Sequence, residues 1–173
     1  LKVGNKASMD EVSQCASFLM KALHAGFSEH KDKFALALPT LDESSPQKKI
    51  STFRVFAESM SDHMQLHEFV TRSGYLDKHF VASFPKTVPE DFAGPYKAFT
   101  RIRIKSRAAG VQRLKKMLEV DTNGNAWINM QSRENGHRFP MYLQSHTAVA
   151  GTPGVLNGYG LSQVDNLLYL PDL

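Results

Sequence analysis

Residues 9–24, MDEVSQCASFLMKALH, predict the first and strongest element of the fold, a helix, because their apolar side chains recur at helical spacing. Ser8 and Glu11 match a capping box at the start of this helix, and Gly26 predicts a left-handed end two residues after His24. The inward stripe consists of Val12, Cys15, Ala16, Leu19 and Leu23. A helix with one apolar face must bury that face, and we expect this one to lie against a sheet.

The segments that follow predict two strands, a second helix and a further strand. Their expected bounds are Phe34–Leu38, Ile50–Ala57, Asp62–Arg72 and Tyr75–Phe84. Turn residues between the first two strands indicate a hairpin. This order is typical of a ferredoxin-like domain that lacks only its opening strand, and residues 1–3 are a candidate for that strand.

Beyond residue 95 the pattern changes to a strand, a basic helix and several short strands. The strand covers Tyr96–Lys105, and the helix begins near Ser106 with Val111, Leu114 and Leu118 expected to face inward. The later strands are expected at 126–130, 138–144, 159–161 and 167–170. We therefore predict an α+β protein with a ferredoxin-like domain at 1–94 and a smaller, strand-rich part at 95–173.

Composition predicts a globular protein with a mild excess of positive charge. Of the 173 residues, 42% are hydrophobic and 22% charged, with a net charge of +4. No apolar run is long enough to cross a bilayer, so no membrane partner is expected. The single cysteine, Cys15, favours a reducing compartment and a cytoplasmic location. This charge permits a polyanionic partner without requiring one.

The most informative physical feature is a cluster of cations on the predicted strand and the helix after it. Arg101, Arg103 and Lys105 share one face of the strand with Phe99. The helix adds Arg107, Arg113, Lys115 and Lys116. Cations grouped in this way can follow the phosphates of a nucleic acid, and arginine can also read guanine edges. The alternative is a solvated sheet face with scattered carboxylate partners.

Histidines are the other residues that could carry chemistry. His24, beside the apolar stripe, would ordinarily cap the end of its helix. His63 and His67 are four residues apart, which suits a metal, but no Cys or Glu lies at a supporting interval. We expect these two to be surface residues, Cys15 to be a packing residue, and neither a metal nor a cofactor to be needed.

Five short stretches, taken in order, resemble the type I-F repeat-cleaving endoribonuclease family of CRISPR systems. They are LH (23–24), FALALPTLDES (34–44), RIRIKS (101–106), QSRENGHRF (131–139) and GYGLS (158–162). Each is weak by itself, whereas five in the family's order are specific. The resemblance implies an enzyme that cleaves the repeat hairpin of precursor CRISPR RNA, with 95–173 as its RNA-binding part.

The resemblance also implies roles for individual residues. His24 matches the catalytic histidine, Ser132 the serine near the attacking hydroxyl, and Tyr159 the tyrosine that orients the histidine. Phe139 matches an aromatic that stacks on a base, and Arg101 with Arg103 matches the pair that reads base edges. The expected reaction is metal-independent attack by the RNA's own 2′-OH, leaving a 2′,3′-cyclic phosphate. Whether His24 acts as base or acid stays open.

The family's enzyme remains on the 3′ hairpin of the mature RNA. The implied partners are therefore the CRISPR RNA and the other subunits of a type I-F surveillance complex or its transposon-associated relative. One alternative is a subunit that binds the hairpin without cutting it, since Glu134 stands where the family often has a second serine. A second alternative is a ferredoxin-like regulatory domain that binds a small molecule or controls transcription.

Overall fold

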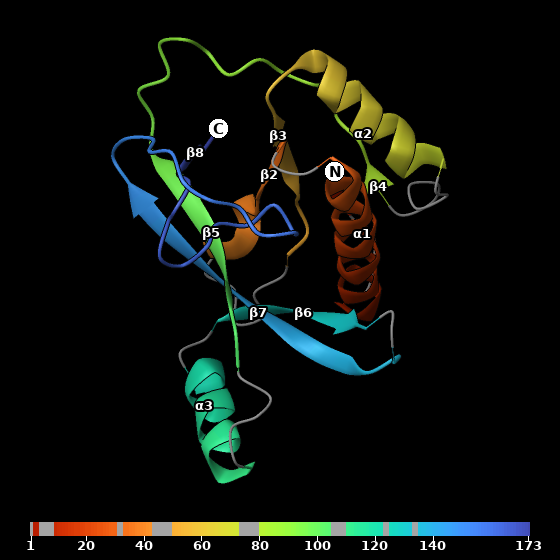
Figure 1. The fold of residues 1–173 in the computed structure, drawn as a ribbon, viewed down its shortest axis with the longest axis vertical. Coiled ribbons are helices and arrows are strands. Elements are labelled where there is room, and N and C mark those ends of the chain that lie inside the picture. The colour runs from red at the N-terminus through yellow and green to blue at the C-terminus, as the bar shows by residue number, and fades with distance from the viewer. Residues whose placement is uncertain are drawn as a thin grey trace.

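The structure, a computed structural model, is a mixed α+β protein (Figure 1). It describes residues 2–3, 9–30, 33–42, 50–72, 80–104, 110–122, 125–132 and 135–173. Its elements are β1 (Lys2–Val3), α1 (Met9–Glu29), β2 (Phe34–Ala37), the 3₁₀ helix η1 (Pro39–Asp42), β3 (Arg54–Ala57), α2 (Met60–Arg72), β4 (Phe80–Val81), β5 (Tyr96–Ile102), α3 (Gly110–Thr122), β6 (Ala126–Gln131), β7 (Arg138–Ala148) and β8 (Leu170–Pro171). The predicted α+β class is confirmed.

Helix α1 is longer than the sequence predicts. It continues past Gly26 to Glu29, so the prediction that Gly26 ends the helix is wrong. A Cβ atom at Gly26 would lie 2.6 Å from Leu66 Cδ1 and 3.2 Å from Phe69 Cδ1, both on α2. The glycine therefore lets the two helices pack closely. Ser8 and the side chain of Glu11 lie outside the described part of the chain.

Two short antiparallel pairs accompany the first two helices. β1 pairs with β4, and β2 pairs with β3 in the register Leu36↔Val55, which confirms the predicted hairpin partners. The second strand is shorter than predicted, because only Arg54–Ala57 of 50–57 joins the ladder. Of the strand expected at 75–84, residues 80–81 are extended and paired, residues 82–84 are not a strand, and residues 75–79 lie outside the described ranges.

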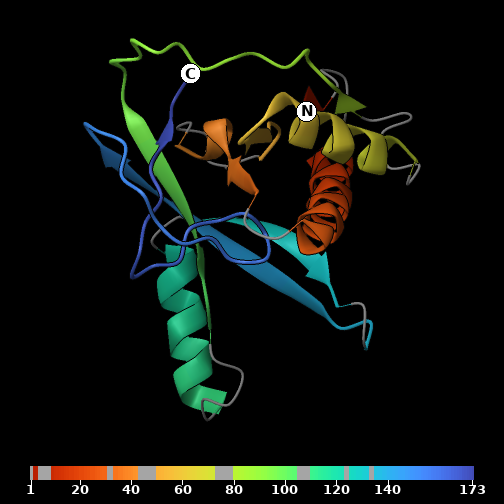
Figure 2. The same ribbon diagram turned by 45° about the horizontal axis from the view of Figure 1, so that its top comes forward.

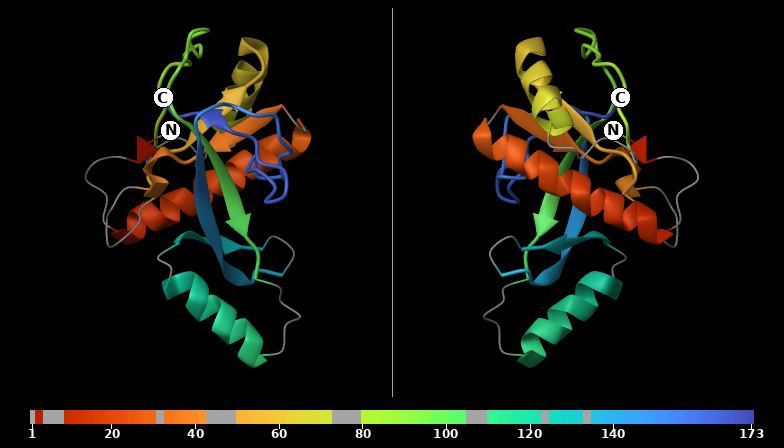
Figure 3. Two further views of the ribbon diagram at one scale, coloured as in Figure 1. Left: turned by 90° about the vertical axis from the view of Figure 1, so that its left-hand side faces the viewer. Right: turned by 90° about the vertical axis from the view of Figure 1, so that its right-hand side faces the viewer.

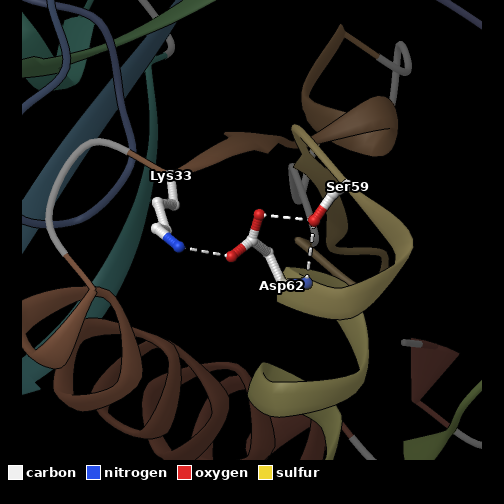
Figure 4. Close-up of polar contacts among 3 residues, drawn as sticks. All are labelled: Lys33, Ser59 and Asp62. Atoms are coloured by element: carbon white, nitrogen blue, oxygen red, sulfur yellow. Dashed lines mark hydrogen bonds and ion pairs between the residues drawn. The ribbon is translucent and has the colours of Figure 1, made fainter.

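The start of α2 is fixed by a polar cluster of three residues (Figure 4). Ser59 caps the helix: its hydroxyl accepts a hydrogen bond from the Asp62 backbone N–H at 3.1 Å and donates to the Asp62 carboxylate at 2.6 Å. Lys33, immediately before β2, binds the other carboxylate oxygen at 2.6 Å. The hydrogen bonds from Lys33 and Ser59 hold the pKa of Asp62 below its ordinary value. The cluster thus joins α2 to the strand pair.

The larger sheet has four antiparallel strands in the order β6-β7-β5-β8. Residues of one face alternate with exposed residues along β6, where Ala126, Ile128 and Met130 are buried. Helix α1 packs against β6, and the larger of the two buried hydrophobic clusters among the described residues runs from α1 and β2 to this sheet. Both 1–94 and 95–173 contribute residues to this core. The division of the chain into two domains at this boundary stays a prediction. The segment from 82 to 95 arches across one end of the molecule, from β4 to β5 (Figure 2).

Helix α3 projects away from this core (Figures 1 and 3). The prediction that Val111, Leu114 and Leu118 face inward is wrong, because these side chains are 73%, 58% and 54% exposed. The stripe exists, but no element of the described chain covers it. The end of the helix is attached through buried Val120, whose carbonyl oxygen accepts a hydrogen bond from the Asn125 side chain at 2.9 Å. None of the helices described combines the length and apolar character needed to span a bilayer.

The chain after β7 is mostly irregular. The strand expected at 159–161 is wrong: these residues form a turn, and only isolated bridges such as Leu156↔Ser162 occur beside it. Of the strand expected at 167–170 only Leu170 is in a strand, β8, which pairs with the start of β5. This C-terminal region nevertheless reaches the core, because Leu161 is fully buried.

Candidate active site

His24 lies inside α1, five residues before the helix ends, and not in the last turn as the sequence indicated. Its half-buried ring is stacked on that of Tyr159, with the ring centroids 4.2 Å apart and an interplanar angle of 20°. Its Nδ1 atom lies 2.5 Å from the carbonyl oxygen of Gly158. Two adjacent residues, Gly158 and Tyr159, therefore hold the imidazole by a ring nitrogen and a ring face, although Gly158 is 134 positions from His24 in the chain.

The bond to Gly158 assigns the tautomer of His24. A carbonyl oxygen can only accept, so Nδ1 must carry a proton and donate it. In the neutral ring the lone pair is then on Nε2, which makes no hydrogen bond to any described residue. This nitrogen is the atom through which His24 can take or give a proton.

The turn at 157–161 presents Gly158 and Tyr159 to the histidine. Asn157 organises it: the side-chain oxygen accepts from the Tyr159 N–H at 2.9 Å, and the backbone oxygen accepts from the Gly160 N–H at 2.9 Å. The Gly160 carbonyl accepts in turn from the Leu36 N–H of β2 at 2.7 Å. The turn is thus fastened to a buried strand.

Two glycines in the turn allow a close approach to α1. Gly160 has a φ of +70°, and a Cβ atom there would lie 2.7 Å from the ring of Phe27. A Cβ atom at Gly158 would lie 3.2 Å from Cε1 of His24. A larger residue at position 160 would therefore push the turn away from the helix, whereas one at position 158 would displace the His24 ring. The sequence GYG signalled a permissive backbone, but the role of the Gly158 carbonyl was missed, since a backbone acceptor has no side-chain signature.

Arg101 and Phe139 extend the site from the sheet. Arg101 on β5 pairs with Leu143, which places both on the face that also carries Phe139. Its guanidinium carbon lies 5.5 Å from the centroid of Phe139 and 5.7 Å from that of Tyr159. His24, Tyr159, Arg101 and Phe139 therefore form a chain of ring contacts, which we call the aromatic column.

The environment of Arg101 differs from the solvated cation face considered in the sequence. The residue shares its face with buried Phe99, as predicted, but is itself half-buried, and its Nε atom is buried without a hydrogen-bond partner. Burial is the main cause that lowers the pKa of Arg101; Tyr159 acts against it and Arg103 with it. Its contacts with two aromatic rings could not be inferred from the alternation of the strand.

Ser132 follows β6 at the start of the connection to β7. Its N–H donates to the His137 carbonyl at 2.9 Å, and its carbonyl accepts from the Gly136 N–H at 3.1 Å. Within the part of the chain that the structure describes, its hydroxyl makes no hydrogen bond to His24 or Tyr159. Its neighbours at positions 133 and 134 lie outside the described residues.

The predicted RNA-binding cations are spread over two elements. Arg103 is exposed just beyond the end of β5, and Lys115 and Lys116 are exposed on α3. Lys105 and Arg107 fall outside the described residues, as does the side chain of Arg113. The structure therefore brings His24, Tyr159, Arg101 and Phe139 together, and leaves the helix lysines on a separate, projecting surface.

His63, His67 and Cys15 are the other residues that the sequence offered as candidates for chemistry. Among the described residues, no three His, Cys, Asp or Glu side chains form a group that could bind a metal ion. His63 is half-buried and His67 exposed on α2; burial lowers the pKa of His63, and His67 lowers it further. Cys15 is buried on α1, in agreement with a packing role.

The aromatic column is the strongest candidate site, because it gives one histidine a fixed tautomer, a supported ring and a neighbouring cation. Comparison with known proteins adds nothing to that geometry. No protein-family model matches this chain, and no curated protein is significantly similar to it in sequence.

Proposed function

We propose that this protein is a metal-independent endoribonuclease that cleaves the repeat hairpin of precursor CRISPR RNA, as its resemblance to the type I-F family implies. The observation that carries the proposal is the way the His24 ring is held: it is stacked on Tyr159, and its Nδ1 atom is hydrogen-bonded to the Gly158 carbonyl. An imidazole held in this way keeps Nε2 for proton transfer at a defined place. Proton transfer is the main task that RNA cleavage by its own 2′-OH leaves to the protein.

The proposed reaction needs no external nucleophile. The 2′-OH beside the scissile phosphate attacks phosphorus, the bond to the 5′ oxygen of the next nucleotide breaks, and a 2′,3′-cyclic phosphate and a 5′-OH result. Nε2 of His24 takes the 2′ proton or supplies a proton to the leaving oxygen. Ser132 aligns the attacking hydroxyl, which is a positioning role.

The remaining residues suit RNA binding. Phe139 is partly exposed at the end of the aromatic column, and an aromatic face there can stack on a base next to the cleavage site. Arg103 extends past β5 and can reach base edges at the foot of a hairpin. Lys115 and Lys116 on α3 can bind the phosphates of its stem.

We further propose that the N-terminal part is ferredoxin-like and that the protein stays on the RNA as the hairpin-end subunit of a surveillance complex. The element order β1-α1-β2-β3-α2-β4 supports the fold assignment, as do the antiparallel pairs β1·β4 and β2·β3. The projecting α3 supports stable binding to the hairpin, because its exposed lysines, Lys115 and Lys116, lie away from the core on a helix that RNA can reach (Figure 3).

The test is cleavage of a type I-F repeat hairpin in EDTA by the wild type, His24→Ala and the control His67→Ala, an exposed histidine on α2. We expect the wild type and His67→Ala to cut once and leave a cyclic phosphate. His24→Ala should bind equally well but cleave at least about 100-fold more slowly. If no protein cuts while all bind, the chain is a hairpin-holding subunit. If none shows salt-sensitive RNA affinity, a regulatory domain is the better interpretation.

A further inference from the structure

Arg101 is the most unusual charged residue of the described chain. It lies on the core face of β5, it has no carboxylate partner among the described residues, and its Nε–H is buried without an acceptor. A buried donor without a partner costs free energy, because its hydrogen bond to water is lost and not replaced. An uncompensated arginine at this position therefore calls for a compensating role.

The rings of Phe139 and Tyr159 are the two aromatic rings that the guanidinium contacts among the described residues. Both centroids lie within 6 Å of its central carbon, at 5.5 Å and 5.7 Å, the range in which a cation is attracted to a ring face. Tyr159 is held by its ring contacts and by its backbone N–H, which donates to Asn157. No described residue bonds its hydroxyl, so the orientation of the ring depends on its neighbours.

Tyr159 is also the stacking partner of His24, at 4.2 Å. Any change in the plane of the tyrosine ring is therefore transmitted to the imidazole, while the bond to Gly158 fixes only Nδ1. Arg101 and His24 do not need to touch for one to affect the other, because both contact the same ring.

We infer that Arg101 is a positioning residue that holds the Tyr159 ring in the plane on which His24 stacks. This role rests on the proposed function for its catalytic meaning, and it is separate from the reading of base edges that the family resemblance implies. Base reading would affect RNA affinity alone. Positioning makes two further statements: Arg101 controls the state of His24 before RNA binds, and it controls the rate once RNA is saturating.

The first test uses the RNA-free protein. We would record the imidazole carbon–proton signals of His24 by NMR, assigned with His24→Ala, in the wild type, Arg101→Gln, Tyr159→Leu and the control Arg103→Gln. Tyr159→Leu removes the stacked ring and so defines the unstacked signal. We expect Arg101→Gln to move the His24 signals toward the Tyr159→Leu position and Arg103→Gln to leave them in place. Unchanged His24 signals in Arg101→Gln would overturn the inference.

A second variant guards against simple unfolding of Arg101→Gln. Phe139→Leu keeps the arginine but removes one of its two ring contacts, so it should shift the His24 signals in the same direction by a smaller amount. The backbone amide spectra of the core strands should stay native in both variants. His24 signals that respond to neither variant in a native fold contradict the positioning role.

The second test measures cleavage at saturating hairpin RNA. Arg101→Gln should lower kcat by about tenfold or more, because misplacement of a catalytic group by a fraction of an ångström is costly. Arg101→Lys keeps the charge without the planar guanidinium, and should restore affinity more than kcat. A loss confined to KM would contradict the inference. If the wild type cleaves no repeat hairpin, the proposed function fails, whereas the NMR result still decides whether Arg101 positions His24.

Discussion

The helices that carry the two halves of the proposed activity are built in opposite ways. α1 is embedded: Leu19 and Leu23 are buried in the core, and His24 meets the C-terminal turn at the rim of that core. α3 projects into solvent with an uncovered apolar stripe and two exposed lysines, and it is anchored near its end by Val120 (Figures 1 and 3).

The contrast between the two helices indicates that the histidine must be held rigidly and that the cations need not be. Proton transfer requires an imidazole fixed to within a fraction of an ångström, which a close-packed surrounding provides. Binding to phosphates requires only positive charge within reach of the RNA backbone. A projecting helix can provide that charge with little packing. We therefore expect changes near α1 to affect stability and rate, and changes on α3 to affect RNA affinity and its salt dependence.

The largest expected contrast compares one leucine from each helix. Leu19→Ala removes a fully buried side chain and should lower the free energy of unfolding by about 2–5 kcal/mol. Leu118→Ala, at 54% exposure, should change it by less than about 0.5 kcal/mol. Urea denaturation measures both. Equal losses would mean that α3 is packed as firmly as α1 and would remove the basis of the comparison.

A second contrast isolates the contact between the C-terminal turn and α1. Gly160 and Gly136 both have positive φ angles, +70° and +66°, so alanine costs each about 1 kcal/mol of backbone strain. Only at position 160 would the new Cβ also lie 2.7 Å from Phe27, which adds about 1–3 kcal/mol. Gly160→Ala should therefore be the more destabilising variant in urea. A reversed order would show that the turn is not pressed against the helix.

Gly158→Ala tests whether the position of the His24 ring controls the rate of cleavage. Gly158 is not among the described glycines with positive φ, so alanine should add little backbone strain. Its Cβ would lie 3.2 Å from Cε1 of His24 and displace the ring by a few tenths of an ångström. We expect cleavage at saturating RNA to slow by about tenfold with unchanged stability and affinity. Full activity in single-turnover assays would show that cleavage does not depend on the exact position of the His24 ring.

The smallest effect is expected on α3. Replacing Lys115 and Lys116 by Gln removes two exposed cations, which should weaken RNA binding several-fold at low salt. The slope of log affinity against log salt should fall by about 1–2. Cleavage at saturating RNA should be retained. Lys86→Gln, a change at an exposed lysine outside the site, is the control and should leave the slope unchanged. An identical slope in the double variant would remove α3 from the interface.

Periodicity located most elements, because apolar side chains repeat with the period of the structure that buries them. It could not give the length of α1, since Gly26 resembles a helix end but serves close packing against Leu66. It also failed for α3. An apolar stripe identifies a face of a helix and says nothing about whether another element lies opposite that face.

The candidate site was predictable in part. His24 and Tyr159 came from the family resemblance, and the structure places their rings in contact. The strand alternation put Arg101 on the same face as Phe99, but the extent of the core along that face depends on tertiary packing. The Gly158 carbonyl could not be found at all, because it is a backbone atom brought to α1 by the fold of a distant turn.

The proposed attack by the RNA's own 2′-OH is tested most directly by changing the RNA and leaving the protein unchanged. After the cleavage position has been mapped, the nucleotide before the scissile phosphate is replaced by its 2′-deoxy form, and binding and cleavage are measured in EDTA. A site that supplies only proton transfer and positioning predicts unchanged binding and no cleavage. Cleavage of the deoxy substrate at the same position would require another nucleophile and would contradict the mechanism assigned to His24.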